Sequence, residues 1–117
     1  MPVIHCVFFK YRPEVAEAQI ASVVPAFAKL QQDCELSNGE RYIAELKCGD
    51  GNTSPEGHGK GFHHAYILTF ADQAHLDYYN ETDPAHQAFK KFVQPLLADV
   101  FVYDFSPLPA AAATASA

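Results

Sequence analysis

A stretch of alternating residues close to the N-terminus, residues 3–11, constrains the fold of this chain more than any other segment. In an extended strand its odd-numbered residues share one face and its even-numbered residues share the other, and both faces are mostly apolar. A strand with two apolar faces must be covered on both sides. We therefore expect a sheet with helices on one face and a second surface on the other.

The remaining segments alternate between helix and strand patterns. Apolar residues spaced by three and four predict an amphipathic helix over residues 14–33. Pro25 removes a hydrogen bond from that helix, so we expect a kink near residues 21–24. Three further strands are predicted over residues 40–48, 62–70 and 100–105. Two further helices are predicted over residues 72–80, where Asp72 is the N-cap, and over residues 84–98.

This order of elements is β-α-β-β-α-β, the ferredoxin-like α+β arrangement. The domain is predicted to span residues 1–107, and the Ala- and Pro-rich residues 108–117 are predicted to be a disordered tail. The sheet face turned away from the helices is predicted to carry an apolar patch that a second copy of the chain would cover, giving a homodimer through the sheet face. Its residues are Ile4, Cys6, Phe8, Ala65, Ile67, Phe101 and Tyr103.

The composition narrows the classes of function. The chain has 117 residues, is 49% hydrophobic and carries a net charge of −6, a balance that disfavours nucleic-acid partners. No apolar run approaches the ~18 residues of a membrane span, and no secretory leader is recognised, so we expect no membrane association. Three cysteines without a Cys-x-x-Cys spacing favour a reducing, cytoplasmic location over a disulfide framework.

Three histidines belong to apolar, inward-facing sets in this arrangement. His5 and His64 lie in the middle of predicted strands, and His86 shares a helix face with Phe89 and Val93. Buried imidazoles that converge on one interior predict a pocket with a base near neutral pH, although each alone is also typical of a hydrogen-bonded core residue. Tyr79 is placed to reach the same cavity.

A metal site is not predicted. His58, His63 and His64 follow no standard zinc spacing, and adjacent residues of a strand point to opposite faces.

Four segments resemble the stress-responsive dimeric α/β-barrel family, known as Dabb. They are residues 3–11, 61–70, 83–89 and 102–107, in the order found in the family. The resemblance implies ferredoxin-like protomers that dimerise through their sheets. Family members include plant polyketide cyclases of the olivetolic acid type, which catalyse an aldol condensation without a cofactor, and a plant hydroxynitrile lyase.

The resemblance to the cyclases also implies roles for single residues. His86 corresponds to a catalytic histidine and Tyr79 to a catalytic tyrosine. His5 and His64 correspond to further pocket histidines. Positions that line the pocket correspond to Val7, Phe9, Val23, Val24, Phe27, Tyr66, Phe89, Val100 and Val102.

These expectations lead to three hypotheses about function. The first is a cofactor-independent cyclase or lyase, in which His86 removes a proton from a small, apolar carbonyl compound such as a polyketide, while Tyr79 and His5 stabilise the oxyanion. The second is a non-catalytic stress-response or ligand-binding homodimer. The third is a cofactor-free monooxygenase of the wider superfamily.

Overall fold

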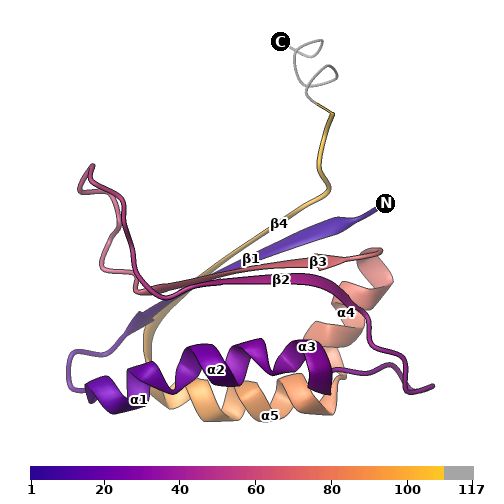
Figure 1. Ribbon diagram of the computed structural model, residues 1–117, viewed down its shortest axis with the longest axis horizontal. Helices are drawn as coiled ribbons and strands as arrows, with labels where there is room; N and C mark the ends of the chain where they lie inside the picture. Colours follow the sequence, from indigo (N-terminus) through magenta and orange to yellow (C-terminus); the bar gives the residue numbers. More distant parts are fainter. Residues whose placement is uncertain (110–117) are drawn as a thin grey trace.

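The computed structural model describes residues 1–109, which form an antiparallel sheet covered on one face by helices (Figure 1). The sheet order is β2-β3-β1-β4. The strands are β1 (Val3–Tyr11), β2 (Ile43–Gly49), β3 (His64–Phe70) and β4 (Leu97–Phe105). The predicted ferredoxin-like α+β order is confirmed, with β2 and β3 beginning a few residues later than predicted.

The predicted helix over residues 14–33 is divided into three short helices. They are α1 (Glu17–Ala21), α2 (Val23–Ala28) and α3 (Leu30–Asp33). The first break falls at Ser22, inside the segment where the missing N–H of Pro25 predicted a kink. A second break at Lys29 was not predicted.

Two aspartates begin the helices of the C-terminal half. Asp72 caps α4 (Gln73–Glu81), because its carboxylate accepts a hydrogen bond from the backbone N–H of His75 at 2.9 Å. Asp83 caps α5 (Pro84–Val93) in the same way through the N–H of Ala85. The cap at Asp72 and the helix start at Pro84 agree with the sequence prediction.

The predicted end of α5 and start of the last strand were wrong. α5 ends at Val93 and is followed by the 3-10 helix η1 (Gln94–Leu96), because Pro95 has no N–H with which to continue the α-helix. The chain therefore enters β4 at Leu97, three residues before the predicted start, and Leu97 pairs with Tyr11 across a bulge.

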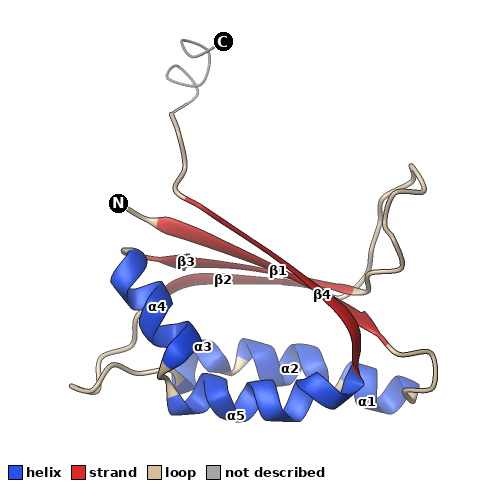
Figure 2. Cartoon of the chain, turned by 180° about the vertical axis from the view of Figure 1, so that it is seen from behind, coloured by secondary structure: helices blue, strands red, loops and turns tan. Residues whose placement is uncertain are grey.

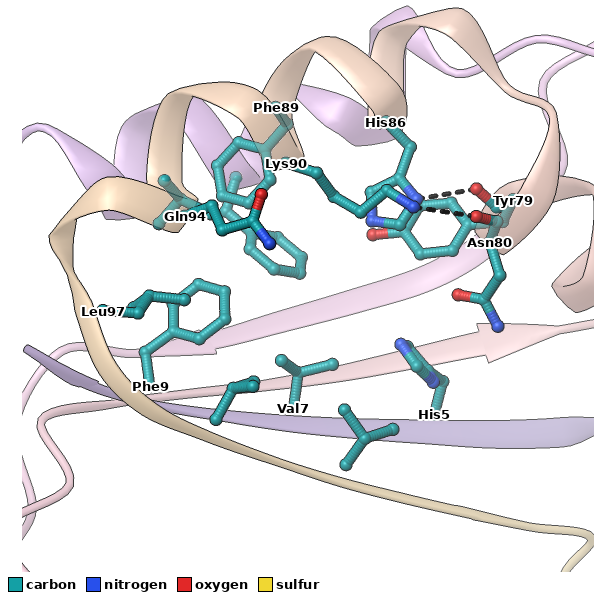
Figure 3. A pocket seen from close by; sticks show the side chains of 14 residues that line it. His5, Val7, Phe9, Tyr79, Asn80, His86, Phe89, Lys90, Gln94 and Leu97 are labelled. Atoms are coloured by element: carbon teal, nitrogen blue, oxygen red, sulfur yellow. Dashed lines mark hydrogen bonds between the residues drawn. The ribbon is translucent and has the colours of Figure 1, made fainter.

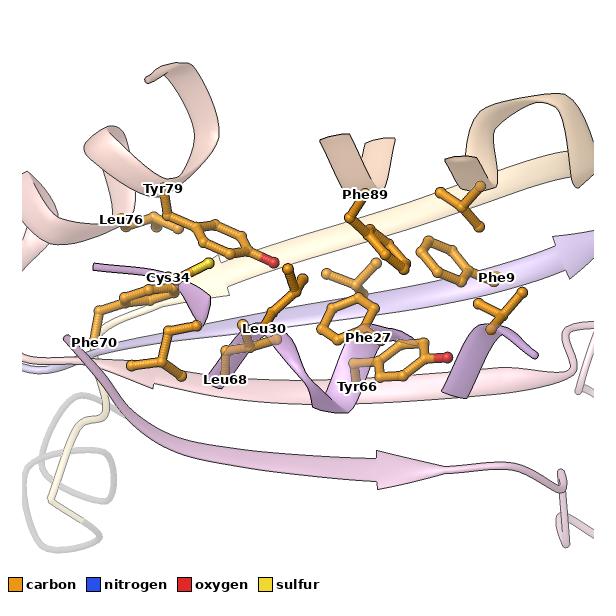
Figure 4. Packing of buried hydrophobic residues seen from close by; sticks show 14 of the residues in the cluster. Phe9, Phe27, Leu30, Cys34, Tyr66, Leu68, Phe70, Leu76, Tyr79 and Phe89 are labelled. Carbon is orange, nitrogen blue, oxygen red and sulfur yellow. The ribbon is translucent and has the colours of Figure 1, made fainter. Parts of the chain in front are cut away.

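The two faces of the sheet have different surroundings. The helices lie together on one side of it (Figure 2), and the inward-facing side chains of β1 and β3 are buried beneath them. Figure 4 shows Phe27 and Leu30 from the helices packed over Tyr66 and Leu68 from the sheet. On the other face Phe101 and Tyr103 are 53% and 59% exposed, as expected for an uncovered apolar surface.

Only part of the predicted tail can be described. Leu108 and Pro109 are exposed and irregular, and residues 110–117 lie outside the described residues. Within residues 1–109, no helix is both long and apolar enough to cross a membrane.

Candidate functional site

A cavity of about 410 Å³ lies between the sheet and α5, a size suited to a small organic ligand. In Figure 3, His86 and Tyr79 approach it from the helical layer, and His5 approaches it from β1. Its walls are mostly apolar. The lining residues are His5, Val7, Phe9, Phe27, Tyr79, Asn80, His86, Phe89, Lys90, Val93, Gln94, Leu97, Val100 and Val102.

His86 lies on the first turn of α5, and its side chain is buried. Its Nδ1 lies 2.6 Å from the backbone carbonyl oxygen of Tyr79. Because a carbonyl can only accept, Nδ1 donates, and the neutral ring has its lone pair on Nε2. Burial lowers the pKa of His86 to about 4, an effect that the hydrogen bond to the Tyr79 carbonyl opposes and that Lys90 reinforces. The ring is therefore neutral at neutral pH and can accept a proton at Nε2.

Tyr79 lies beside His86 at the end of α4. The two rings are stacked, with centroids 3.7 Å apart and an interplanar angle of 12°. The Tyr79 hydroxyl is buried and has no hydrogen-bond partner among residues 1–109. Burial raises the pKa of this phenol well above its ordinary value, so it stays protonated. Tyr79 lines the cavity, and its unpartnered buried O–H favours a hydrogen-bond acceptor that comes within reach.

His5 is held by a carboxylate from the neighbouring strand. His5 and Asp104 face each other across β1 and β4, and His5 Nδ1 donates to Asp104 Oδ1 at 2.5 Å. This hydrogen bond orients the ring and leaves Nε2 free for other partners. The His5 ring also meets the Tyr79 ring edge to face, with centroids 5.9 Å apart.

The structure therefore brings together three of the predicted catalytic residues, but not the fourth. His5, Tyr79 and His86 line the cavity, whereas His64 does not. The expectation that His64 shares their chamber was wrong, because β1 and β3 are antiparallel and His64 pairs with Phe9 while His5 pairs with Leu68. Three residue pairs of the ladder thus lie between the two histidines.

His64 has its own surroundings. Its Nδ1 is 2.8 Å from the hydroxyl oxygen of Tyr11, and burial lowers its pKa. It borders a separate hollow of the surface together with Glu17, Val24 and Asp50.

The predicted pocket-lining residues divide in the same way. Six of them line the cavity: Val7, Phe9, Phe27, Phe89, Val100 and Val102. Val23, Val24 and Tyr66 do not. Val23 is fully buried in the core, Val24 lines the hollow beside His64, and the Tyr66 ring stacks on Phe27 with centroids 3.7 Å apart. Their predicted place in the pocket was wrong, since they lie behind its wall or beyond it.

Several polar residues in or next to the cavity were missed by sequence reasoning. Asp104 could have been found only from the register of β1 against β4, which sequence patterns do not specify. Lys90 had a readable signal, because it follows His86 by four residues on a helix and so shares its face. Asn80 and Gln94 carried no such signal.

The comparison with protein families decides where this chain belongs. Residues 3–107 match the family described as the Stress responsive A/B Barrel Domain, or Dabb. The chain is a member of the Dabb family. The family resemblance of the four sequence segments is therefore confirmed. A comparison of this Dabb chain with curated proteins found no match.

Solved structures share the fold of this Dabb protein at low sequence identity. A hydroxynitrile lyase from Passiflora edulis is 25% identical, with a TM-score of 0.76, over 92% of this chain and 97% of that one. A protein from Arabidopsis thaliana is 21% identical, with a TM-score of 0.79 and the same two coverages. A dimeric ferredoxin-like protein of unknown function from Jannaschia sp. CCS1 is 20% identical, with a TM-score of 0.72, over 92% and 100%.

Proposed function

We propose that this Dabb protein is a cofactor-independent lyase or cyclase that uses His86 as a general base on a small, apolar carbonyl compound. The observation that carries the proposal is the pairing of His86 Nδ1 with a backbone carbonyl, which directs the lone pair to Nε2 at an apolar cavity. The likeness to a hydroxynitrile lyase supports the same class of chemistry.

The proposed reaction begins with the removal of a proton. In a cyclase reaction Nε2 of His86 takes the proton from a carbon next to a carbonyl, and the C–H electron pair forms an enolate. The enolate carbon then attacks a second carbonyl of the same substrate, and the imidazolium returns the proton to the resulting alkoxide. In a lyase reaction Nε2 takes the proton from a hydroxyl, and the oxygen's electron pair forms the carbonyl as the carbon–carbon bond breaks. The leaving group departs with the electron pair of that bond and takes the proton back from the imidazolium.

The negative charge that develops on oxygen needs donors nearby. The unpartnered hydroxyl of Tyr79 supplies one. His5 supplies a second when it is protonated on both nitrogens, since Asp104 holds only Nδ1. The apolar walls strengthen both interactions because they exclude water.

The test compares two matched histidine variants. Small ketones in D₂O are followed by NMR for exchange of the proton next to the carbonyl, and hydroxynitriles are followed by cyanide release. We expect His86→Gln to lower the rate by about 10²–10⁴-fold, the usual contribution of a general base. His64→Gln removes a buried histidine that does not line the cavity, and should leave the rate nearly unchanged.

Tyr79→Phe is the third variant of the activity test. It should slow the same reaction without loss of stability, because it removes a buried hydroxyl that has no partner. Turnover that survives in His86→Gln would contradict the assignment of the base. A chain that binds ligands in the cavity but turns none over would support the alternative of a non-catalytic binding protein, and oxygen consumption would support a monooxygenase.

We also propose that the protein is a homodimer joined through the uncovered face of its sheet. Phe8 and Phe101 meet there with ring centroids 5.8 Å apart, and Phe101 and Tyr103 are more than half exposed. Structures with the same fold are described as dimeric. Sedimentation at micromolar concentration should give twice the chain mass, and Phe101→Asp should give the monomer.

A further inference from the structure

Lys90 is the one ammonium group that lines the cavity in the described part of the chain. It lies four residues after His86 on α5, so the two side chains project from the same face one turn apart. Figure 3 shows the Lys90 side chain beside His86, with its Nζ directed toward Asn80.

No carboxylate among residues 1–109 neutralises the charge of Lys90. Its Nζ donates to the backbone carbonyl oxygen of Asn80 at 3.0 Å. None of the ion pairs formed within residues 1–109 includes it. An ammonium group has three donors, so this contact leaves two available. A half-buried cation that is satisfied by only one neutral carbonyl favours an anionic ligand.

The rest of the cavity specifies what kind of anion fits. One cation matches one negative charge, and the net charge of −6 on the chain disfavours a polyanion. The amides of Asn80 and Gln94 add neutral polar groups, while most of the remaining lining is aliphatic or aromatic. The ligand that matches these features is an apolar molecule with a single carboxylate.

We propose that Lys90 determines specificity, and that the substrate is a keto acid whose carboxylate pairs with its ammonium group while its carbonyl lies at His86. The placement of the carbonyl rests on the proposed function, whereas the recognition of the carboxylate does not. One turn of helix separates the two side chains, which suits a short spacer between the two groups of the ligand.

Binding of a carboxylate would also assist the base. Lys90 is one of the groups that lower the pKa of His86, after burial, which is the largest cause. A carboxylate next to Lys90 offsets that contribution and makes the imidazole a stronger base.

Lys90 also has a structural contact, which the test must separate from recognition. The carbonyl of Asn80 that accepts from Lys90 also accepts from Nε2 of Gln87 at 3.1 Å. Because Gln87 remains as a donor, loss of the Lys90 ammonium leaves this carbonyl satisfied. We therefore expect Lys90→Met to fold.

The experiment measures binding of two probes that differ only in their terminal group, the carboxylate of 3-phenylpropanoate and the neutral amide of 3-phenylpropanamide, by calorimetry on the full chain. The wild-type protein should bind the carboxylate about tenfold more tightly than the amide, as expected for one charge-assisted contact. Lys90→Met should remove this preference while keeping the affinity for the amide, and Lys90→Arg should restore it.

Lys91→Met is the matched control, because Lys91 is the next residue of the same helix, is exposed and does not line the cavity. It should keep the preference for the carboxylate. Equal binding of both probes to the wild type, no binding of the carboxylate at millimolar concentration, or a preference that survives in Lys90→Met would overturn the proposal.

The His86→Gln variant distinguishes this proposal from the proposed function. If the chain has no catalytic activity but recognises carboxylates through Lys90, His86→Gln and the wild type keep the same preference and neither turns over any ketone. If the function is right and Lys90 has no role in recognition, turnover depends on His86 while Lys90→Met leaves the preference unchanged.

Discussion

His86 and His64 are two buried histidines at opposite ends of one helix-covered sheet surface. Their exposed fractions are 9% and 6%, and both have a hydrogen bond at Nδ1. Burial lowers the pKa of each. Burial and a satisfied ring nitrogen therefore do not separate a candidate catalytic base from a core residue.

The difference lies in the partner and in the neighbouring volume. The partner of His86 is a carbonyl, which only accepts and so determines which nitrogen carries the proton. The partner of His64 is the hydroxyl of Tyr11, which can donate or accept and leaves the tautomer open. Beside His86 is an apolar cavity, whereas beside His64 the rings of Tyr11 and Tyr66 fill the inner side and the remaining hollow lies at the surface next to Glu17 and Asp50.

The same contrast applies to the helices above the sheet. α2 packs closely, with Phe27 stacked on Tyr66 and Val23 fully buried, while one face of α5, from His86 to Val93, borders an open volume. A site that can hold a ligand thus arises where side chains leave the interior open, next to a side chain whose orientation its neighbours already hold. Two measurements test whether the filled and open regions differ in this way.

The larger effect concerns stability at low pH. The pKa of His86 falls from 6.5 to about 4 on folding, so between these values the unfolded chain binds more protons than the folded chain. This contribution to stability is present above pH 6.5 and is lost as the pH falls to 4. We expect the loss to be about 3 kcal/mol.

Urea unfolding at pH 7 and pH 4, at one protein concentration, measures this loss. Wild type should lose about 3 kcal/mol more than His86→Gln between the two pH values. His64→Gln should differ from wild type in the same direction, because its pKa is also lowered. If wild type and His86→Gln lose equal stability, the imidazole is not buried in its neutral form.

The smaller effect compares two buried valines, one in each region. Val23 is in the packed core, whereas Val93 lines the cavity. Val23→Ala removes two methyl groups and leaves a void, and should cost about 3 kcal/mol. Val93→Ala only widens an existing cavity, and should cost about 1.5 kcal/mol, near the transfer free energy of the two methyl groups alone. Denaturant unfolding of both variants gives the two values, and a larger cost for Val93→Ala would mean that the cavity is closed in solution.

Much of the fold could be read from local patterns. The alternation in residues 3–11, the cap at Asp72, the helix start at Pro84 and the effect of Pro25 act over a few residues, so each was visible in the sequence. The start of β4 was misplaced because the sequence did not show that a 3-10 turn would follow α5.

The candidate site was only partly readable for a different reason. His5, Tyr79 and His86 point inward by local periodicity and by the family resemblance, and the structure places all three at one cavity. The place of His64 depends on strand register, and so does the pairing of His5 with Asp104.

The order of the elements and the choice of inward-facing side chains were thus readable along the chain, since both follow from short-range geometry. Which of those side chains meet, and where the interior is filled or open, emerged only from the folded arrangement. Strand register and the docking of helices bring together residues from distant parts of the chain. No local pattern encodes that arrangement, because it results from packing the whole chain at once.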